Sequence, residues 1–361
     1  MEYKELAKIY HMDSTSKRDS ADVRLAADRR KAESAFRLGY PSTGDEFFIA
    51  VPRELSMLNE RVLRTERKLS AQFKSLLGIA SNAILRGLVL DEVVSSNEIE
   101  GVRSTHRQFK DALEAEDNSA PRRRFRELAT LYMDLMNGTA QMPKTPKDIR
   151  RIYNCAMGGE IGKKDILDGA LFRAEGVDIL GGRNKVSRRG LEPESRIVEA
   201  LERMLAIASS EDISSLYGAI AAHYLFEYAH PFYDGNGRTG RYLLALYLSV
   251  PLSAATSLSL SRTIAEHRRQ YYKAFEIAEN PLNHGELIHF VYMMLGLVNM
   301  AQEDILERLD ETNTSYKRLS DVMGSIKEGL GLKKKESMAL SCNGSWRLSS
   351  ARWWRWSFSA A

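Results

Sequence analysis

The chain has 361 residues, of which 43% are hydrophobic and 28% charged, an ordinary composition for a soluble globular protein with room for two or three packed units. Its two cysteines, Cys155 and Cys342, are too few and too far apart for a disulfide framework. The first residues lack an apolar signal region, and no apolar run reaches the roughly 18 residues that a membrane span needs. We therefore expect a cytoplasmic protein without a membrane span.

The formal net charge of +4 is concentrated near the C-terminus. Residues 331–361 hold six lysines and arginines against one glutamate, so residues 1–330 are close to neutral. A near-neutral body gives no electrostatic reason to expect nucleic-acid binding. All four tryptophans lie in the last 16 residues, interleaved with Arg and Ser. This pattern fits either an aberrant terminus or a Trp/Arg patch that touches membrane or single-stranded nucleic acid.

Most of the chain has the apolar spacing of helices, and little of it has the alternation of strands. Residues 1–38 are charged and helix-prone, and the Pro-Ser-Thr-Gly loop at 41–44 ends that segment. Two helices are predicted between Leu55 and Glu116. Further helices are predicted at about 122–136, 146–157, 193–208, 214–229, 238–249, 264–279 and 284–310.

One short β-hairpin is predicted near residues 171–188. Its first strand is Leu171–Leu180, which Gly181 and Gly182 close, and its second strand is Lys185–Arg188. The predicted fold is therefore all-α, with a helical core and one small hairpin.

The segment HPFYDGNGRTGR, residues 230–241, has the features of an anion site. A glycine-rich turn that leads directly into a helix presents several backbone N–H groups in one direction. Gly235 and Gly237 allow positive φ and a close approach of the backbone to a ligand. Arg238 and Arg241 lie three residues apart, so both guanidinium groups can reach a polyphosphate.

The same segment also carries a carboxylate and a histidine. Asp234 lies beside the anion site, and proteins commonly hold Mg²⁺ with one carboxylate together with substrate phosphates. His230 ends the preceding helix and has the pKa range of a general base. A plain loop with a capping histidine would explain Gly-Asn-Gly alone, but the whole string indicates phosphoryl or nucleotidyl transfer.

The string matches the Fic motif, H-P-F-x-[D/E]-G-N-G-R-x-x-R, at every defined position, and the chain resembles the Fic family over about residues 85–300. The strand-like LFRAEGVDI is similar to the family's flap, which holds the target segment by strand addition. The segments SLSLSRTIAEHRRQYYKAF and HGELIHFVYMML are similar to the helices that follow the loop in relatives.

The resemblance implies a role for each residue of the loop. His230 would take the proton from the target hydroxyl, and Phe232 would be a buried anchor. Asp234 would bind Mg²⁺ between the α- and β-phosphates of ATP. Arg238 would contact the β-phosphate and Arg241 the γ-phosphate. The anion hole would consist of Gly235, Asn236 and Gly237, with the Asn236 amide on the α-phosphate.

A second motif lies upstream, where Ser96-Asn97-Glu98-Ile99-Glu100-Gly101 matches the family's inhibitory pattern, [S/T]-x-x-x-E-[G/N]. A serine four residues before a glutamate is by itself typical of a solvated helix end. Beside a Fic loop, the pattern predicts that Ser96 and Glu100 belong to an inhibitory helix. Glu100 would then pair with Arg241 in a bidentate way and withhold it from ATP.

The resemblance predicts three regions. Residues 1–138 would be an N-terminal helical region whose inhibitory helix spans about 83–101. Residues 139–311 would be the Fic catalytic core. Residues 312–361 would be a C-terminal tail, which is interpreted as a truncated or aberrant winged-helix region.

The implied activity is protein adenylylation, with Mg²⁺ as cofactor, ATP as donor and a Ser, Thr or Tyr hydroxyl of an unknown target protein as acceptor. Self-modification is expected, removal of AMP is a linked activity, and an oligomer is compatible with the sequence. A kinase-like or other nucleotide transferase is a weaker alternative, because relatives that phosphorylate depart from the Gly-Asn-Gly-Arg-x-x-Arg string. The alternative from another class is a nucleotide-binding regulator with a C-terminal DNA-binding segment.

Overall fold

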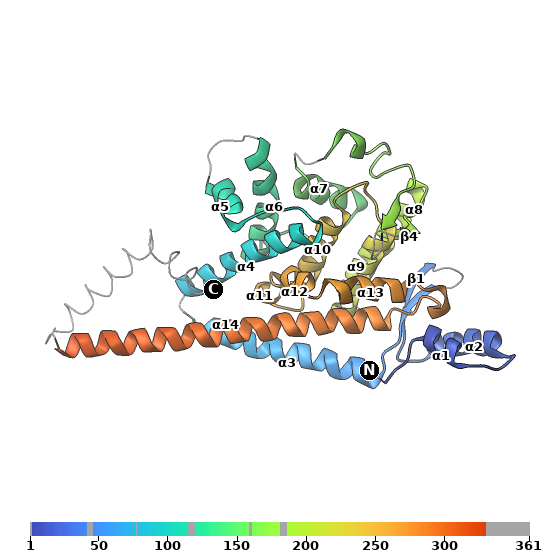
Figure 1. Ribbon diagram of the computed structural model, residues 1–361, viewed down its shortest axis with the longest axis horizontal. Helices are drawn as coiled ribbons and strands as arrows, with labels where there is room; N and C mark the ends of the chain where they lie inside the picture. Colours follow the sequence, from blue (N-terminus) through green and yellow to red (C-terminus); the bar gives the residue numbers. More distant parts are fainter. Residues whose placement is uncertain are drawn as a thin grey trace. The chain divides into compact units, whose positions relative to one another are not determined.

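The computed structural model describes residues 2–41, 46–76, 78–114, 120–158, 161–180 and 186–329. The chain divides into two compact units, residues 1–305 and 306–361. Helices dominate the described residues, and the strands in them form two antiparallel pairs (Figure 1). The predicted all-α class is therefore confirmed.

The first unit holds most of the secondary structure. Its helices are α1 (Leu6–Met12), α2 (Arg18–Lys31), α3 (Arg53–Ser75), α4 (Gly78–Ile99), α5 (His106–Glu114), α6 (Ala120–Asn137), α7 (Pro146–Ala156), α8 (Glu194–Ala208), α9 (Ser215–Ala229), α10 (Asn236–Leu248), α11 (Ala254–Ser257), α12 (Leu260–Glu266) and α13 (Arg268–Ala278), with 3₁₀ turns η1 (Lys163–Asp165) and η3 (Pro281–Asn283). Its strands are β1 (Phe36–Pro41), β2 (Glu46–Ile49), β3 (Asp178–Leu180) and β4 (Val186–Arg189).

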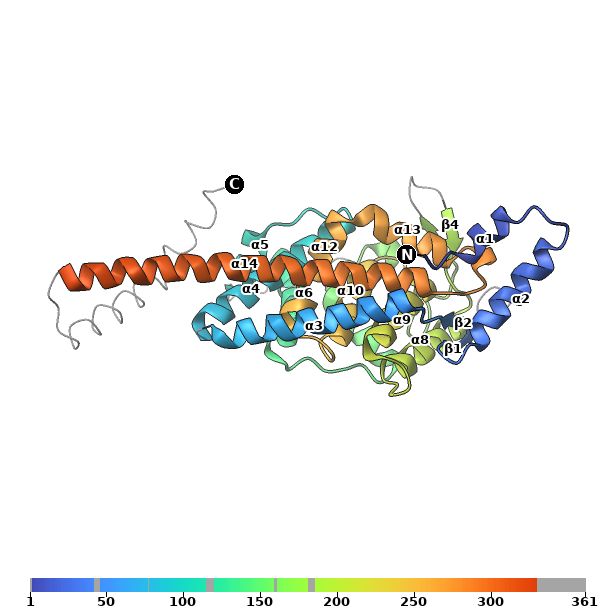
Figure 2. The same cartoon turned by 90° about the horizontal axis from the view of Figure 1, so that it is seen from below.

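The core is built on α9 and α10, which are consecutive in the chain and are connected by the first residues of the motif. Twelve of the 15 residues of α9 and 12 of the 13 residues of α10 are buried. Helix α9 is apolar around most of its circumference, whereas α10 has a polar first half at the loop and an apolar second half. Helix α10 lies between α4 and α9 in both views (Figures 1 and 2). This packing brings the region of the second sequence motif, on α4, next to the loop.

A hairpin near the N-terminus corrects the prediction that residues 1–38 are only helical. Strands β1 and β2 pair antiparallel. Strand β2 is also tied to the segment before α14 (Ile288–Gly329), because the Phe48 N–H donates to the Gly285 carbonyl at 3.1 Å and the Leu287 N–H donates to the Phe48 carbonyl at 2.9 Å. Residues 42–45, which include most of the predicted loop, lie outside the described residues.

The predicted hairpin near 171–188 is present, but its first strand is shorter than expected. Strands β3 and β4 pair antiparallel, and residues 171–177 are irregular. The reason is a competing partner for the backbone, since the Glu194 carboxylate accepts the N–H groups of Leu171 and Phe172 at 2.6 and 2.9 Å. Residues 181–185 at the turn lie outside the described residues.

Other helix boundaries differ from the predicted ones. The region between Leu55 and Glu116 contains α3, α4 and α5 instead of two helices. The predicted helix at 264–279 divides at His267, which is the C-cap of α12 and the N-cap of α13. Helix boundaries are the part of a sequence pattern that apolar spacing specifies least.

The described residues of the second unit, 306–329, belong to helix α14. Residues 312–329 of the predicted C-terminal tail are therefore helical, and residues 330–361, with all four tryptophans, lie outside the described residues. Among the described helices, none combines the length and apolarity that crossing a bilayer requires.

Candidate functional site

The loop between α9 and α10 has an unusual backbone at both ends. His230 caps the C-terminus of α9 in the left-handed region, with φ 49°, and its N–H donates to the Phe226 carbonyl at 3.0 Å. Gly235 is the N-cap of α10, with φ 80°. A left-handed non-glycine residue is uncommon, and here it turns the chain sharply so that His230 and the start of α10 belong to one short loop.

Two arginines from the segment around the β3–β4 hairpin hold the C-terminal end of α9. Arg173, fully buried, donates through Nε to the His230 carbonyl at 2.8 Å and through Nη2 to the Ala229 carbonyl at 3.3 Å. Arg188 donates to the Tyr228 and Glu227 carbonyls at 2.7 and 2.6 Å. The last carbonyls of a helix have no partner inside it, and positive charge is favourable there.

Neither arginine has a predicted role in a sequence motif. Arg173 lies within the strand-like segment LFRAEGVDI, and Arg188 is the last residue of the predicted hairpin. Their partners lie about 40 to 57 positions further along the chain, so local spacing carries no signal for these contacts. The sequence signal for them is limited to basic residues in and after the segment LFRAEGVDI, which resembles the family's flap.

The surroundings of His230 keep its imidazole unprotonated at neutral pH. Burial lowers the pKa of His230, the positive charges of Arg188 and Arg173 lower it further, and the resulting value is about 3. A hydrogen bond from the ring to the Glu227 carbonyl acts in the opposite direction. That bond uses one ring nitrogen as donor, so the other nitrogen of the neutral ring is an acceptor.

Phe232 and Asn236 fix the shape of the loop. Phe232 is fully buried and stacks on Tyr153, with ring centroids 3.6 Å apart. The Asn236 side chain donates to the Phe232 carbonyl at 2.7 Å and accepts from the Phe232 N–H at 3.0 Å. Both ends of this side-chain amide are used inside the loop, so the group that Asn236 offers to a ligand is its backbone N–H in the first turn of α10.

The glycines of the loop mark two close approaches. A Cβ atom at Gly235 would collide with the Met157 thioether, and the positive φ would strain any other residue there. A Cβ atom at Gly237 would collide with a carboxylate oxygen of Glu100. The Glu100 carboxylate therefore lies directly against the first turn of α10, where the backbone N–H groups are exposed to an anion.

Arg241 joins the two sequence motifs. Its Nη1 lies 2.8 Å from Oε1 of Glu100, while its Nε and Nη2 donate to the Ser96 hydroxyl at 3.0 Å and the Ser96 carbonyl at 2.8 Å. The structure thus brings Ser96, Glu100 and Arg241 together across 145 positions of sequence. The expected bidentate pairing is corrected, because two of the three guanidinium nitrogens are bound by Ser96 rather than by the carboxylate.

Burial and charge act against each other at Arg241. The side chain is only 2% exposed, and burial acts to lower the pKa of its guanidinium, but the negative charge of Glu100 and smaller contributions from Tyr271 and Glu227 raise it. Arg241 is therefore a fixed positive charge at the loop. Arg238, one turn earlier, is equally buried.

The Asp234 carboxylate is accessible to a metal ion at the loop. Its side chain is exposed, and its Oδ1 accepts the Gly235 N–H at 2.7 Å. Among the described residues, no group of three His, Cys, Asp or Glu side chains converges on a metal position. A single exposed carboxylate beside an anion site fits Mg²⁺, which usually takes one or two protein carboxylates and completes its shell with phosphates and water.

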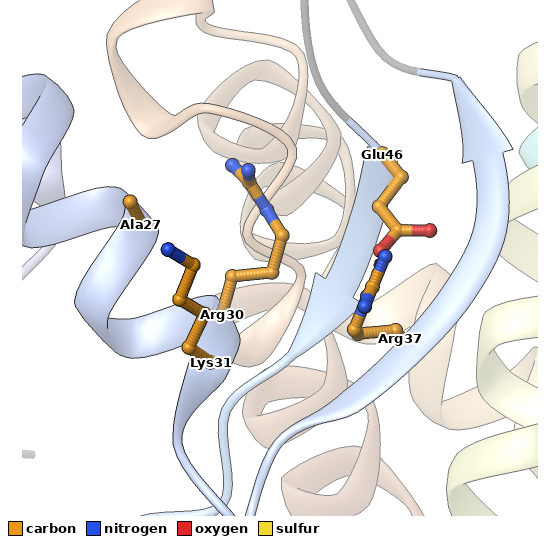
Figure 3. Close-up of a pocket in the computed structure, with 5 residues that line it drawn as sticks. All are labelled: Ala27, Arg30, Lys31, Arg37 and Glu46. Atoms are coloured by element: carbon orange, nitrogen blue, oxygen red, sulfur yellow. Dashed lines mark hydrogen bonds and ion pairs between the residues drawn. The ribbon is translucent and has the colours of Figure 1, made fainter.

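A cavity of about 310 Å³ lies away from this loop, between α2 and the β1–β2 hairpin (Figure 3). Arg30 and Lys31 line it from the last turn of α2, and Arg37 pairs with Glu46 across the two strands. Basic residues in the last turn of a helix complement its dipole, which accounts for their presence there. The cavity shares no residue with the motif loop.

Residues 143–248, which contain the whole loop, match the family model described as the Fic/DOC family. This segment is a Fic/DOC domain. His230, Asp234 and Arg241 lie within the matched residues, whereas Ser96 and Glu100 lie outside them.

Solved structures of Fic proteins have the same fold. A Fic family protein from Desulfovibrio desulfuricans G20 is 19% identical, with a TM-score of 0.58 over 74% of this chain and 77% of that one. Fic-1 from C. elegans is also 19% identical, with a TM-score of 0.52 over 72% of this chain and 74% of that one. At this identity the likeness extends to the fold alone.

Proposed function

We propose that the protein is an adenylyltransferase that moves AMP from Mg·ATP to a Ser, Thr or Tyr hydroxyl of a target protein. The observation that carries the proposal is the loop itself, where a neutral histidine, an exposed carboxylate, two buried arginines and the first turn of α10 meet. Base, metal ligand and anion cradle are the parts that nucleotidyl transfer needs.

The nucleotide end of the site is an anion cradle. Backbone N–H groups of Gly235, Asn236 and Gly237 would receive the α-phosphate, as the Gly-rich start of a helix does for other phosphates. Arg238 would contact the β-phosphate and Arg241 the γ-phosphate. The position of the Glu100 carboxylate against Gly237 and Arg241 supports this assignment, because an acidic group already lies where phosphate oxygens would bind.

The transfer step needs a base and a fixed phosphate. His230 accepts the proton of the target hydroxyl, whose oxygen forms a bond to the α-phosphorus while the bond to the β-phosphate oxygen breaks and pyrophosphate leaves. Mg²⁺ on Asp234 would neutralise charge on the triphosphate and on the leaving group. The negative charge of bound ATP would raise the pKa of His230 from about 3 toward the working pH, which strengthens it as a base.

Glu100 would inhibit this reaction, and Ser96 would hold the Arg241 side chain where it pairs with Glu100. While the carboxylate occupies the start of α10, the γ-phosphate would lose its arginine and the triphosphate would be displaced from the cradle. If Glu100 instead positions a water molecule, the same site would remove AMP from a modified target.

The proposal is tested by mass spectrometry of the protein after incubation with Mg·ATP. An adenylyltransferase that modifies itself gains the mass of one adenylyl group, whereas a kinase-like relative gains the mass of a phosphoryl group. The Glu100→Gly variant is measured in parallel, since a braked wild type reacts slowly. If neither protein gains mass nor labels added proteins, and both still bind ATP, the chain is a nucleotide-binding regulator instead.

Replacing Asp234 with alanine should remove the effect of Mg²⁺ on ATP binding together with the activity. Calorimetry of ATP binding with and without Mg²⁺ measures this. Asp168→Ala is the matched control, because Asp168 is an exposed carboxylate beside the loop that accepts from the Tyr233 hydroxyl at 2.9 Å. Should Mg²⁺ strengthen ATP binding equally in Asp234→Ala and wild type, another residue holds the metal.

A further inference from the structure

We propose that Arg188 is a positioning residue that holds the base-bearing end of α9, the flap strand β4 and helix α13 in one fixed arrangement. The proposal rests on the proposed function, because the role it assigns to Arg188 is to place the base relative to the target. Arg188 lies outside the loop string HPFYDGNGRTGR. It nevertheless contacts the helix that carries His230 and a helix that follows the loop.

All three nitrogens of the Arg188 guanidinium are bound to different residues. Nη1 and Nη2 donate to the carbonyls of Tyr228 and Glu227 in the last turn of α9, at 2.7 and 2.6 Å. Nε donates to Oε1 of Glu279, the C-cap of α13, at 2.6 Å. The guanidinium also lies over the Tyr228 ring, 4.8 Å from its centroid. One side chain of β4 thus joins the ends of two helices.

These contacts depend on the shape of an arginine as well as on its charge. The Arg188 and Glu279 side chains are 15% and 14% exposed, so water screens their ion pair less than it would at the surface. The two carbonyls belong to a helix end, where backbone acceptors have no partner within the helix. A planar fork can serve these three acceptors at once, whereas a lysine ammonium is a point charge and cannot span them in the same way.

Arg188 also acts on the base itself. Its contacts end two residues before His230, and its charge and that of Arg173 both lower the pKa of His230, while the hydrogen bond to the Glu227 carbonyl raises it. Arg173 binds the Ala229 and His230 carbonyls, so the two arginines bind different carbonyls at the same helix end. Only Arg188, of these two, also binds α13 through Glu279.

The consequence concerns the target protein rather than the nucleotide. If a target segment adds to the β3–β4 hairpin, its hydroxyl must lie in line with the α-phosphate and within reach of His230. A side chain that fixes β4 directly to the helix end beside His230 sets that distance. Loss of Arg188 would therefore lower the transfer rate to a bound target and leave ATP binding nearly unchanged, since Arg188 contacts none of the residues of the anion cradle in the described bonds.

The test compares Arg188→Gln with Arg189→Gln, both in the Glu100→Gly background so that transfer is measurable. Arg189 is the matched control, because it is the next residue of β4 and pairs at 3.2 Å with Glu192, with the two side chains 62% and 43% exposed. We expect Arg188→Gln to lower kcat for a protein target on the order of 10- to 100-fold, with KM for ATP little changed. Arg189→Gln should lower kcat far less, since Arg189 makes none of the contacts with the end of α9 and with Glu279 that Arg188 makes.

A second readout separates positioning from a loss of folding. The acidic limb of the pH–rate profile should move to higher pH in Arg188→Gln, because removal of a nearby positive charge raises the pKa of the base. Arg188→Lys should keep the acidic limb close to its original place and still lose rate, since it retains the charge without the fork. If Arg188→Gln does not fold, Glu279→Gln replaces it and should lower kcat without moving ATP affinity.

The outcomes also distinguish this proposal from the proposed function. NMR titration of the His230 ring from pH 7 to pH 4, without ATP, should show protonation beginning at higher pH in Arg188→Gln than in Arg189→Gln. If no protein transfers AMP but this difference appears, the proposed function fails and the effect of the Arg188 charge on His230 stands. Equal titration and equal kcat in the two variants would overturn the role of Arg188.

Discussion

Replacing Glu100 with glycine should raise the rate of AMP transfer by on the order of 10²-fold. In the structure Oε1 of Glu100 lies 2.8 Å from Nη1 of Arg241, and the same carboxylate rests against Gly237 at the start of α10. ATP that binds beside this carboxylate would meet a negative charge where its γ-phosphate belongs. A displacement of about 1 Å at the reacting phosphorus is enough for a rate loss of that size.

The strength of the Glu100–Arg241 pair does not by itself account for such a brake. The Glu100 side chain is 32% exposed, and pairs open to solvent contribute only about 0.2–1 kcal/mol. The docking of α4 supplies the rest, because the Ser96 hydroxyl and carbonyl bind the same guanidinium. Glu92, one turn before Ser96, accepts the N–H and hydroxyl of Ser261 at the start of α12 at 2.8 and 2.5 Å. The brake is thus a matter of position rather than of one strong ion pair.

The measurement is self-modification or labelling of added proteins at equal concentrations of folded protein. Glu98→Gly is the matched control, since Glu98 is an exposed carboxylate two residues earlier, near the same end of α4. It should leave the rate near the wild-type value. Combining Glu100→Gly with Arg241→Ala should cancel the gain, because the γ-phosphate contact is then absent. A Glu100→Gly protein no faster than wild type would remove Glu100 from regulation and leave the catalytic loop untouched.

Replacing His230 with alanine should lower AMP transfer about 10²- to 10⁴-fold and leave the affinity for ATP nearly intact. A general base contacts the target hydroxyl in the transition state and makes little contact with the phosphates in the ground state. The imidazole is neutral at pH 7 because burial, Arg188 and Arg173 lower its pKa to about 3. It is therefore already in the form that accepts a proton, and acid should reduce activity as the ring becomes protonated.

Transfer is assayed with α-labelled ATP in the Glu100→Gly background, and ATP affinity is measured by calorimetry on the same samples. His223→Gln serves as a comparison, because His223 lies on the same helix but its ring is bound by the Gly240 carbonyl and the Tyr271 hydroxyl, at 3.2 and 2.8 Å. We expect its loss to reduce thermal stability rather than to abolish transfer. Undiminished transfer by His230→Ala would show that another group accepts the proton.

The sequence by itself determined the features that depend on neighbouring residues. The string HPFYDGNGRTGR is contiguous, so its place at the junction of two helices and the grouping of His230, Asp234 and Arg241 follow from local chain geometry. Helices α8 and α9 were predicted to within one residue at each end, because their apolar spacing is strong and their boundaries are marked by proline, serine and a histidine cap. The Fic resemblance rests first on the same contiguous string.

Weaker local patterns did not predict all the strands correctly. Strand β1 follows a charged helical segment, and its alternation of buried Leu38 and Tyr40 with exposed neighbours is too short to stand out. Strand β2 is stabilised by Gly285 and Leu287, more than 230 positions away. Before the β3–β4 hairpin, Glu194 binds backbone N–H groups that a strand would have used, and thereby shortens β3. Such competition between partners is invisible to periodicity.

The family resemblance predicted that Glu100 meets Arg241, but the tertiary structure decided the form of that contact and which other charges lie at the loop. Arg241 binds both Ser96 and Glu100, and the end of α9 is held by Arg173 and Arg188 from the region of the β3–β4 hairpin. Hydrogen bonds and ion pairs act over about 3 Å, whereas these partners are separated by about 40 to 145 residues of chain. Sequence spacing constrains such pairs only within one helix or hairpin, so their formation depends on how α4, α9, α10 and β4 pack together.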